Sequence, residues 1–404
     1  MNHRCPDLSP PRAWRFVVLL GAVSLLSDLT FEGARSVSGP FLGALQAGPL
    51  VIGLVSGLGE FLGYGVRLAS GRLTDRLGRY WPITFTGYAV NLLAMPCLAL
   101  AGSWPAAAAL LLLERLGKAL RTPARDAMLS HAAAAVGRGR AFGLHKALDQ
   151  VGAILGPLFL ALLLQRTGDY RQGFALLALP AGLALLVLLL AARLYPHPQR
   201  LEGPAAPLKT QGLGRLFWWF TPAGGLMGAG FADFPLLAFH LARAGQISVA
   251  GIASLYALAM AAEAGFALLL GRLYDRRGLQ VVIAATLASA AAAPLIVLGG
   301  VPQACLGVGL WGVGRALLET VLKAVLADLV PPDRRATGYG VYAGVFGACW
   351  CAGSALMGWL SSFSLSGLAL FSLLAQAAAV PLWLKLGRDI HPGSPRHAPR
   401  PQTP

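Results

Sequence analysis

The sequence predicts an all-α membrane protein in which 12 transmembrane helices form two six-helix, pseudo-symmetric halves. Three observations lead to this prediction. Hydrophobic residues make up 56% of the chain and charged residues only 12%, about half the charged share of an ordinary soluble protein. The length of 404 residues leaves room for about a dozen spans of about 20 apolar residues each. A loop sequence also occurs twice. A soluble globular fold is therefore excluded.

Apolar segments of spanning length follow one another along the whole chain, and each is assigned one helix. In the first half we expect helices at about 14–45, 49–73, 80–102, 104–124, 139–165 and 172–194. In the second half we expect helices at about 214–242, 248–272, 279–299, 302–328, 336–361 and 364–387. The predicted domains are an N-terminal half (1–194), a cytoplasmic linker rich in Pro and Gly (195–213), a C-terminal half (214–388) and a disordered cytoplasmic tail (389–404).

The distribution of Lys and Arg predicts the orientation in the membrane. The N-terminus, the C-terminus and the even-to-odd connections, Arg121 and Arg125 among them, hold 23 of the 33 basic residues. The opposite side holds only Arg166, Arg171 and Arg243. Because basic loops stay in the cytoplasm, we expect both termini there. Membrane topology thus explains the net charge of +16 better than nucleic-acid binding does.

Two loops repeat one another. The segment Gly71–Ile83 recurs as Gly271–Ile283, and each copy joins the second and third helix of its half. Two halves of the same orientation form a parallel repeat, an organisation found in secondary transporters whose substrate site lies between the halves. The repeat therefore predicts a central site near the middle of the membrane.

The repeated loop resembles the signature G-x-L-x-D-R-x-G-R of the major facilitator superfamily. The first copy contains Gly71, Leu73, Asp75, Arg76, Gly78 and Arg79, and the second contains Gly271, Leu273, Asp275, Arg276 and Gly278, with Leu279 in place of the last arginine. The resemblance extends over nearly the whole chain, and the stretch 121–158 also looks like poorly characterised bacterial members. It implies the superfamily's fold, secondary transport, and a gating role for these loops, in which the carboxylate meets a helix N-terminus.

The fifth predicted helix resembles the superfamily's antiporter motif. Gly143, Gly152, Gly156 and Pro157 match it, whereas Leu160 and Ala161 replace its terminal glycines. Small residues allow close helix approach, so this helix could pack against its counterpart in the other half and seal a leak. Packing without any antiporter role is the alternative.

Charged residues inside predicted spans indicate a polar cavity, because charge at the bilayer centre costs on the order of 2.5 to 3.5 kcal/mol. Asp28, Glu32 and Arg35 share one helix face, and Arg315, Glu319 and Lys323 form a stripe at i, i+4 and i+8. The residues that we expect at a proton-coupling site or substrate cavity are Asp28, Glu32, Arg35, Arg115, Lys118, Asp233, Glu263, Arg315, Glu319 and Lys323.

Structural ion pairs are the alternative for several of these charges. The stripe on the tenth helix could be a salt-bridge ladder that only holds helices together, and Arg67, Arg115 and Asp149 could be pairs near a cytoplasmic gate. Arg35 lies three residues from Glu32 and is expected to pair with it. That pairing leaves Asp28 as the predicted proton carrier.

These features predict an inner-membrane transporter that works by alternating access. Proton-coupled export of a small organic solute is the preferred mode, because of the antiporter-like motif. Proton-coupled uptake of an organic anion is the alternative within transport, and a membrane receptor or scaffold is the alternative outside it. The expected partners are the solute, protons and the lipid bilayer, with no nucleic acid, and the protein is expected to work as a monomer.

The motifs predict no enzyme, metal or cofactor. Gly307, Gly309 and Gly312 fit G-x-G-x-x-G but lie in an apolar span without a preceding strand.

Overall fold

The computed structural model describes residues 10–77, 80–196, 214–330 and 335–389. All regular secondary structure in these ranges is helical. Residues 390–404 of the predicted tail and 197–213 of the predicted linker lie outside the described residues.

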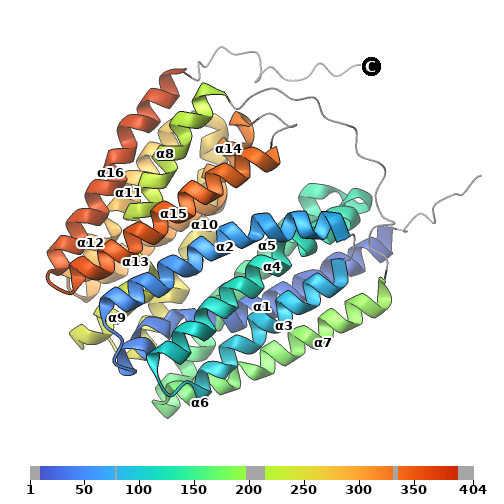
Figure 1. Cartoon of the computed structure of the whole chain (residues 1–404), viewed down its shortest axis with the longest axis horizontal. Helices are drawn as coiled ribbons and strands as arrows, with labels where there is room; N and C mark the ends of the chain where they lie inside the picture. The colour runs from blue at the N-terminus through green and yellow to red at the C-terminus, as the bar shows by residue number, and fades with distance from the viewer. Residues whose placement is uncertain (1–9, 78–79, 197–213, 331–334, 390–404) are drawn as a thin grey trace, which may run out of the picture.

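The helices follow one another with short connections, as the sequence predicts (Figure 1). The first half contains α1 (Pro10–Ala44), α2 (Pro49–Leu77), α3 (Tyr80–Cys97), α4 (Trp104–Val136), α5 (Arg138–Thr167), α6 (Tyr170–Leu176) and α7 (Ala178–Leu194). The second half contains α8 (Arg215–Gly230), α9 (Phe234–Ala244), α10 (Val249–Arg277), α11 (Leu279–Ala290), α12 (Ala292–Leu298), α13 (Val301–Ala316), α14 (Leu322–Leu329), α15 (Arg335–Ser361) and α16 (Leu365–Asp389).

Twelve helical segments correspond to the twelve predicted spans, since four spans are interrupted. The pairs α6/α7, α8/α9 and α11/α12 each form one span, and a π-helical turn at Leu317–Val321 joins α13 to α14. Eleven of the segments in the described ranges are long and apolar enough to cross a membrane. The twelfth is α4, whose many charged side chains lower its hydropathy.

Helix α4 is longer than predicted. It continues to Val136, whereas the sequence predicted an end at about residue 124. Pro123 lies inside the helix, and proline cannot bond to the carbonyl four residues earlier. That carbonyl belongs to Ala119 and accepts a hydrogen bond from the Ser70 hydroxyl of α2 at 2.9 Å. A neighbouring helix thus satisfies the freed backbone group. The assignment of Arg121 and Arg125 to a cytoplasmic loop is therefore wrong, since both lie within α4.

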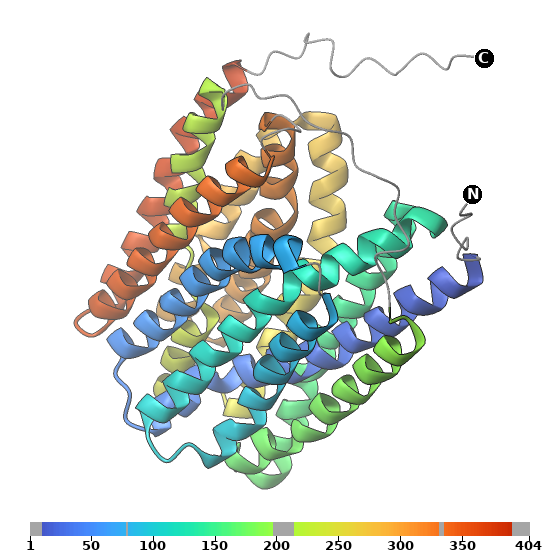
Figure 2. The same cartoon turned by 45° about the vertical axis from the view of Figure 1, so that its right-hand side comes forward.

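The two ends of the bundle differ. One end, here called the terminal face, carries the start of α1, the end of α7, the start of α8 and the end of α16 (Figures 1 and 2). The other end, here called the opposite face, carries the short connections α1–α2, α5–α6 and α9–α10. The two halves meet through α2 with α15, α5 with α10 and α1 with α9.

Close glycine contacts join the halves toward the opposite face. A β-carbon at Gly39 of α1 would overlap the Pro235 carbonyl oxygen of α9, and one at Gly53 of α2 would overlap the Ser354 carbonyl oxygen of α15. A β-carbon at Gly57 would lie 2.9 Å from the α-carbon of Cys351. Backbones approach this closely only where a side chain is missing. The halves are therefore in tight contact at this end.

Toward the terminal face the same helices separate. β-carbons at Gly63 and Gly65, further along α2, would meet no atom within 4 Å, and the same holds for Gly344 of α15. Between these regions, a β-carbon at Gly347 would still lie 3.4 Å from Phe61 of α2. The interface therefore closes at the opposite face and opens toward the terminal face.

Two glycines of the antiporter-like motif, Gly152 and Gly156, pack within the first half, whereas Gly143 borders open space. A β-carbon at Gly152 would overlap the Leu25 carbonyl oxygen of α1, and one at Gly156 would overlap that of Leu29. The expectation that they pack α5 against its counterpart, α15, is wrong, because α5 crosses to the second half at α10. Their structural role is the close contact between α1 and α5.

We expect Gly152→Ala to lower the thermal unfolding midpoint of the purified protein, while Gly143→Ala leaves it near the wild-type value. The first substitution forces α1 and α5 apart, and such overpacking typically costs about 1–3 kcal/mol. The second adds a methyl group in open space, with no atom within 4 Å. Equal midpoints for the two variants would contradict the assigned role of Gly152.

The repeated loops lie at the terminal face. In the first copy Gly71, Asp75 and Arg76 belong to the last turns of α2, while Gly78 and Arg79 lie outside the described residues. In the second copy Gly271 lies within α10, Asp275 and Arg276 are exposed near its end, and Gly278 connects α10 to α11. Gly278 has φ 58° and ψ −138°, a conformation that favours glycine. The gating role of both loops stays a prediction.

Candidate functional site

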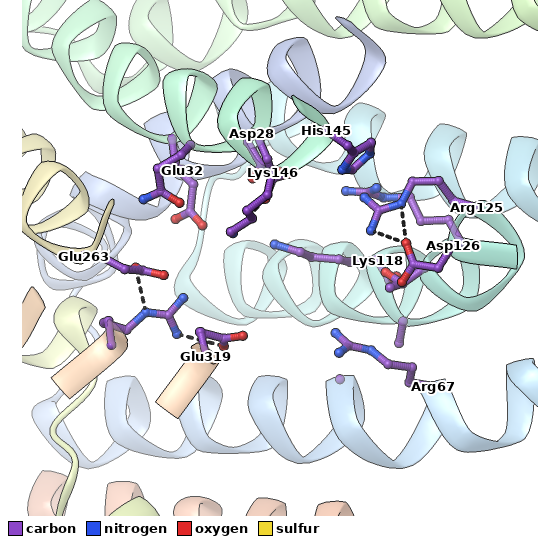
Figure 3. A pocket seen from close by; sticks show the side chains of 18 of the residues that line it. Asp28, Glu32, Arg67, Lys118, Arg125, Asp126, His145, Lys146, Glu263 and Glu319 are labelled. Carbon is purple, nitrogen blue, oxygen red and sulfur yellow. Dashed lines mark hydrogen bonds and ion pairs between the residues drawn. The ribbon is translucent and has the colours of Figure 1, made fainter. Parts of the chain in front are cut away.

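A polar cavity of about 490 Å³ lies between the halves. Its lining comes from α1, α2, α4 and α5 of the first half and from α10, α13, the π-helical turn and α14 of the second half (Figure 3). Nine of the ten predicted site residues line it, the exception being Asp233. Its charged lining residues are Asp28, Glu32, Arg35, Glu60, Arg67, Arg115, Lys118, Arg121, Arg125, Asp126, Lys146, Asp149, Glu263, Arg315, Glu319 and Lys323.

Glu60 of α2 joins three helices of the first half. Its Oε1 lies 2.9 Å from Nη2 of Arg35 on α1 and 3.1 Å from Nη2 of Arg115 on α4. Arg115 also lies 3.5 Å from Glu114, which accepts a 2.6 Å hydrogen bond from Asn91 of α3. Removing one member of such a buried network leaves charges uncompensated, which is strongly destabilising. These residues fix the floor of the cavity.

Glu32 bonds across the two halves instead of pairing with Arg35. The hydroxyl of Tyr256 on α10 donates a 2.6 Å hydrogen bond to Oε2 of Glu32. The predicted ion pair between Glu32 and Arg35 is therefore wrong, because Arg35 points to Glu60. Tyr256 lies 224 residues away in the chain, so the sequence offered no local signal for this contact.

The stripe on the tenth span forms an ion-pair ladder along the cavity wall. Arg315 lies 3.2 Å from Glu263 of α10 and 3.5 Å from Glu319, and Glu319 lies 2.5 Å from Lys323. Glu319 occupies the π-helical turn, an irregularity that occurs frequently at functional sites. The ladder thus neutralises much of the charge on the side of the cavity that belongs to the second half.

Asp28 occupies the opposite wall beside α5. Its neighbour Asp149 accepts a 2.8 Å hydrogen bond from Ser24 of α1 and lies 2.9 Å from Lys146. The carboxyl groups of Asp28 and Asp149 are close enough to interact electrostatically. No basic group of the described residues lies within ion-pair distance of Asp28, which is only 7% exposed. Asp28 is therefore a buried carboxyl group in the cavity without a fixed counter-charge.

Three basic side chains also lack a carboxylate partner among the described residues. They are Arg67 of α2 and Lys118 and Arg121 of α4, and all three line the cavity. Each lies against an aromatic ring: Lys118 on Phe31 at 3.8 Å, Arg121 on Tyr88 at 4.1 Å and Arg67 on Tyr64 at 5.9 Å. The first half therefore presents positive charge to the cavity.

Asp233 lies outside the cavity, in the break between α8 and α9. It is 1% exposed and accepts hydrogen bonds from Ser354 at 2.6 Å and from Trp350 at 3.2 Å, both on α15. Its Oδ1 lies 3.9 Å from Nη2 of Arg35, so it connects the halves between the cavity and the opposite face. This position makes Asp233 part of the closed layer.

Several cavity residues were missed in the sequence. Arg121 and Arg125 were placed in a loop and Asp126 was not singled out, yet their spacing from Lys118 continues one helical face. Gln150 of α5 donates a 2.9 Å hydrogen bond to the Met260 carbonyl oxygen of α10. The sequence gives no indication of this contact, because the partner of Gln150 is a backbone carbonyl oxygen in the other half and not a side chain of matching charge.

Comparison with known proteins assigns the family. The family model described as Major Facilitator Superfamily matches residues 20–241 and 223–404. The chain belongs to the Major Facilitator Superfamily and is a membrane transporter of that type. The resemblance seen in the loop motif and the fold predicted from the repeat are thus confirmed.

Individual relatives agree with this assignment. The chain is 42% identical to an uncharacterized protein of Mycobacterium tuberculosis over 364 residues, which cover 88% of this chain and 89% of the relative. It is 28% identical to an uncharacterized MFS-type transporter of Methanocaldococcus jannaschii, over 86% of this chain and 89% of that protein. A crystal structure of a POT family transporter in complex with a thioalcohol-conjugated peptide shares the fold, with a TM-score of 0.76 and 13% identity over 93% of this chain and 96% of the other.

Proposed function

We propose that this transporter moves a small organic solute across the bacterial inner membrane by alternating access and is driven by protons. The observation that carries the proposal is the charged cavity, which both halves line and which their contacts close at the opposite face. A solute in this cavity contacts both halves at once. Its affinity can therefore differ between the two states, as a coupled carrier requires.

The buried acids support protons as the coupling ion. Asp28 lines the cavity without a fixed basic partner, and a buried carboxyl group in this situation can exchange a proton at low energetic cost. Glu32 bonds to Tyr256 of the other half, so a change in its environment accompanies any separation of α1 from α10. Asp28 is thus the proposed proton carrier, and the Glu32–Tyr256 hydrogen bond joins its helix, α1, to the other half.

Export with both termini in the cytoplasm is the preferred direction and orientation. Without Arg121 and Arg125, which lie within α4, 21 basic residues remain on the side of the termini against 3 on the other. This bias supports the orientation, in which the cavity of this structure opens to the cytoplasm. The antiporter-like glycines support export only weakly, because they pack α5 on α1 within one half.

Uptake of an organic anion with protons is the second candidate, and the cavity charges favour it. Arg67, Lys118 and Arg121 lack carboxylate partners in the described part of the chain, whereas only Asp28 and Glu32 among the lining acids lack a basic partner. A net positive cavity attracts an anionic solute.

Transport into proteoliposomes tests this function. Compounds that raise the unfolding midpoint of the purified protein would be loaded inside or outside vesicles that carry a pH gradient. We expect movement against the solute gradient that stops when a protonophore collapses the pH gradient. Movement toward the acidic side indicates export, and movement away from it indicates uptake. Ligands that bind but are never transported under either gradient would instead support the receptor or scaffold.

A further inference from the structure

We propose that Lys118, Arg67 and Arg121 form a subsite for an anionic group of the transported solute, a carboxylate or a phosphate. The inference rests on the proposed transport function and adds the chemical class of the substrate. It places the charged end of the solute against α2 and α4 of the first half.

The distribution of ion pairs distinguishes these three cations from the others. Six further basic side chains line the cavity, and each has a carboxylate within ion-pair distance: Arg35, Arg115, Arg125, Lys146, Arg315 and Lys323. Within the described ranges, Lys118, Arg67 and Arg121 have none. The carboxylates of Asp28 and Glu32 interact with Lys118 only from beyond ion-pair distance. A cation in a membrane cavity without a direct counter-charge is costly, so an anionic ligand gains most at these positions.

Aromatic rings occupy the place of the missing carboxylates. The Lys118 amine lies 3.8 Å from the ring centre of Phe31, and the Arg121 guanidinium lies 4.1 Å from that of Tyr88. A ring face stabilises a cation without neutralising its charge. The rings therefore leave the positive charge of these side chains uncompensated, whereas a carboxylate partner would compensate it.

Buried guanidinium donors without hydrogen-bond partners in the described ranges also support an anion subsite. Nε and Nη1 of Arg121 are buried and have no hydrogen-bond partner among the described residues, and the same is true of Nε of Arg67. Arg121 is only 1% exposed. Buried polar groups without partners are uncommon and require an explanation. A bound oxyanion offers several acceptor oxygens to guanidinium donors.

The geometry provides room for such a ligand. In Figure 3 the side chains of Lys118, from α4, and Arg67, from α2, extend toward the open centre of the cavity, across from Glu263 and Glu319. The ladder of Arg315, Glu319 and Lys323 carries its own counter-charges on that far wall. An anionic group is thus attracted to the first half, and the remainder of the solute faces the second half.

Binding of simple oxyanions to the purified full-length protein tests the subsite. Inorganic phosphate and acetate would be titrated at constant ionic strength against chloride, with the unfolding midpoint as the readout. We expect saturable stabilisation of the wild type by at least one of the two oxyanions. In Lys118→Gln and Arg67→Gln the apparent affinity should fall about tenfold or more, as expected for loss of a hydrogen bond to a charged group.

Two further variants keep the result interpretable. Lys118→Arg retains the charge and should keep most of the binding, so a loss in Lys118→Gln is then due to charge. Arg166→Gln removes an exposed charge at the opposite face and should bind like the wild type.

The subsite would be overturned if Lys118→Gln and Arg67→Gln bound the oxyanions as tightly as the wild type does. It would also be overturned if neither phosphate nor acetate stabilised the wild type. Stabilisation by tetramethylammonium but not by the oxyanions would also overturn it. That last outcome would leave the proposed transport function standing, because a cationic solute can be carried through the same cavity.

Discussion

Asp28→Asn is expected to abolish proton-driven accumulation while exchange of the solute down its own gradient continues. A pH difference of one unit stores about 1.4 kcal/mol per proton, which supports about tenfold accumulation. Without the titrating group this ratio should fall from about tenfold to unity. Asn keeps the size of the side chain, so binding and the movement of the halves persist.

The choice of Asp28 follows from the partners of its neighbours. Glu60 lies between two arginines, Asp149 is paired with Lys146, and Glu32 accepts a hydrogen bond from Tyr256. Asp28 alone among these acids has neither a basic partner within ion-pair distance in the described residues nor a hydrogen-bonding tyrosine. Asp28 is therefore the acid that is least tied to a basic partner, and it interacts with a second carboxyl group, that of Asp149.

The experiment compares two assays in the same proteoliposomes. Accumulation under an imposed pH gradient should be lost in Asp28→Asn, and counterflow without a gradient should remain. The matched variant is Glu32→Gln, whose amide oxygen can still accept the Tyr256 hydrogen bond and which should retain proton-driven accumulation. Full accumulation in Asp28→Asn would show that another group carries the proton, Asp233 and Glu263 being next, or that the coupling ion is not a proton.

The sequence predicted most of the fold because the membrane restricts the possibilities. Apolar length defined the spans and the repeated loop defined the two halves, but the end of α4 was misplaced and the interruptions within four spans were not predicted. In α4, the hydroxyl of Ser70 bonds to the carbonyl that Pro123 leaves free. Such a contact between helices has no signature in the local sequence, so the continuation of α4 beyond Pro123 could not be predicted from it.

Membership of the cavity was also predictable, but the pairing of its charges was not. A charged residue in a span must face polar surroundings, and this rule correctly selected nine lining residues. Partners depend on how α1, α2 and α4 rotate against one another, which sequence spacing on one helix does not specify. Arg35 accordingly pairs with Glu60 of the next helix instead of Glu32 of its own. Asp233 was separated from the cavity by the break between α8 and α9.

A larger side chain at Gly53 is expected to prevent closure of the opposite face. Even a β-carbon there would overlap the Ser354 carbonyl oxygen of α15, and overpacking of about 1–3 kcal/mol shifts the ratio of two states by about 5- to 150-fold. Gly53→Leu should therefore favour the state open at the opposite face and reduce transport. Gly48→Leu is the matched control, since a β-carbon at Gly48 meets no atom within 4 Å.

Distances between spin labels at the two ends of the bundle test the central claim, that the halves alternate around the cavity. One pair would join Arg140 of α5 to Arg276 of α10 at the terminal face, and the other would join Arg166 of α5 to Arg243 of α9 at the opposite face, all four being exposed. In Gly53→Leu we predict a longer distance at the opposite face and a shorter one at the terminal face than in the wild type and Gly48→Leu. Unchanged distances at the terminal face, with or without a change at the opposite face, would contradict alternating access by these two halves.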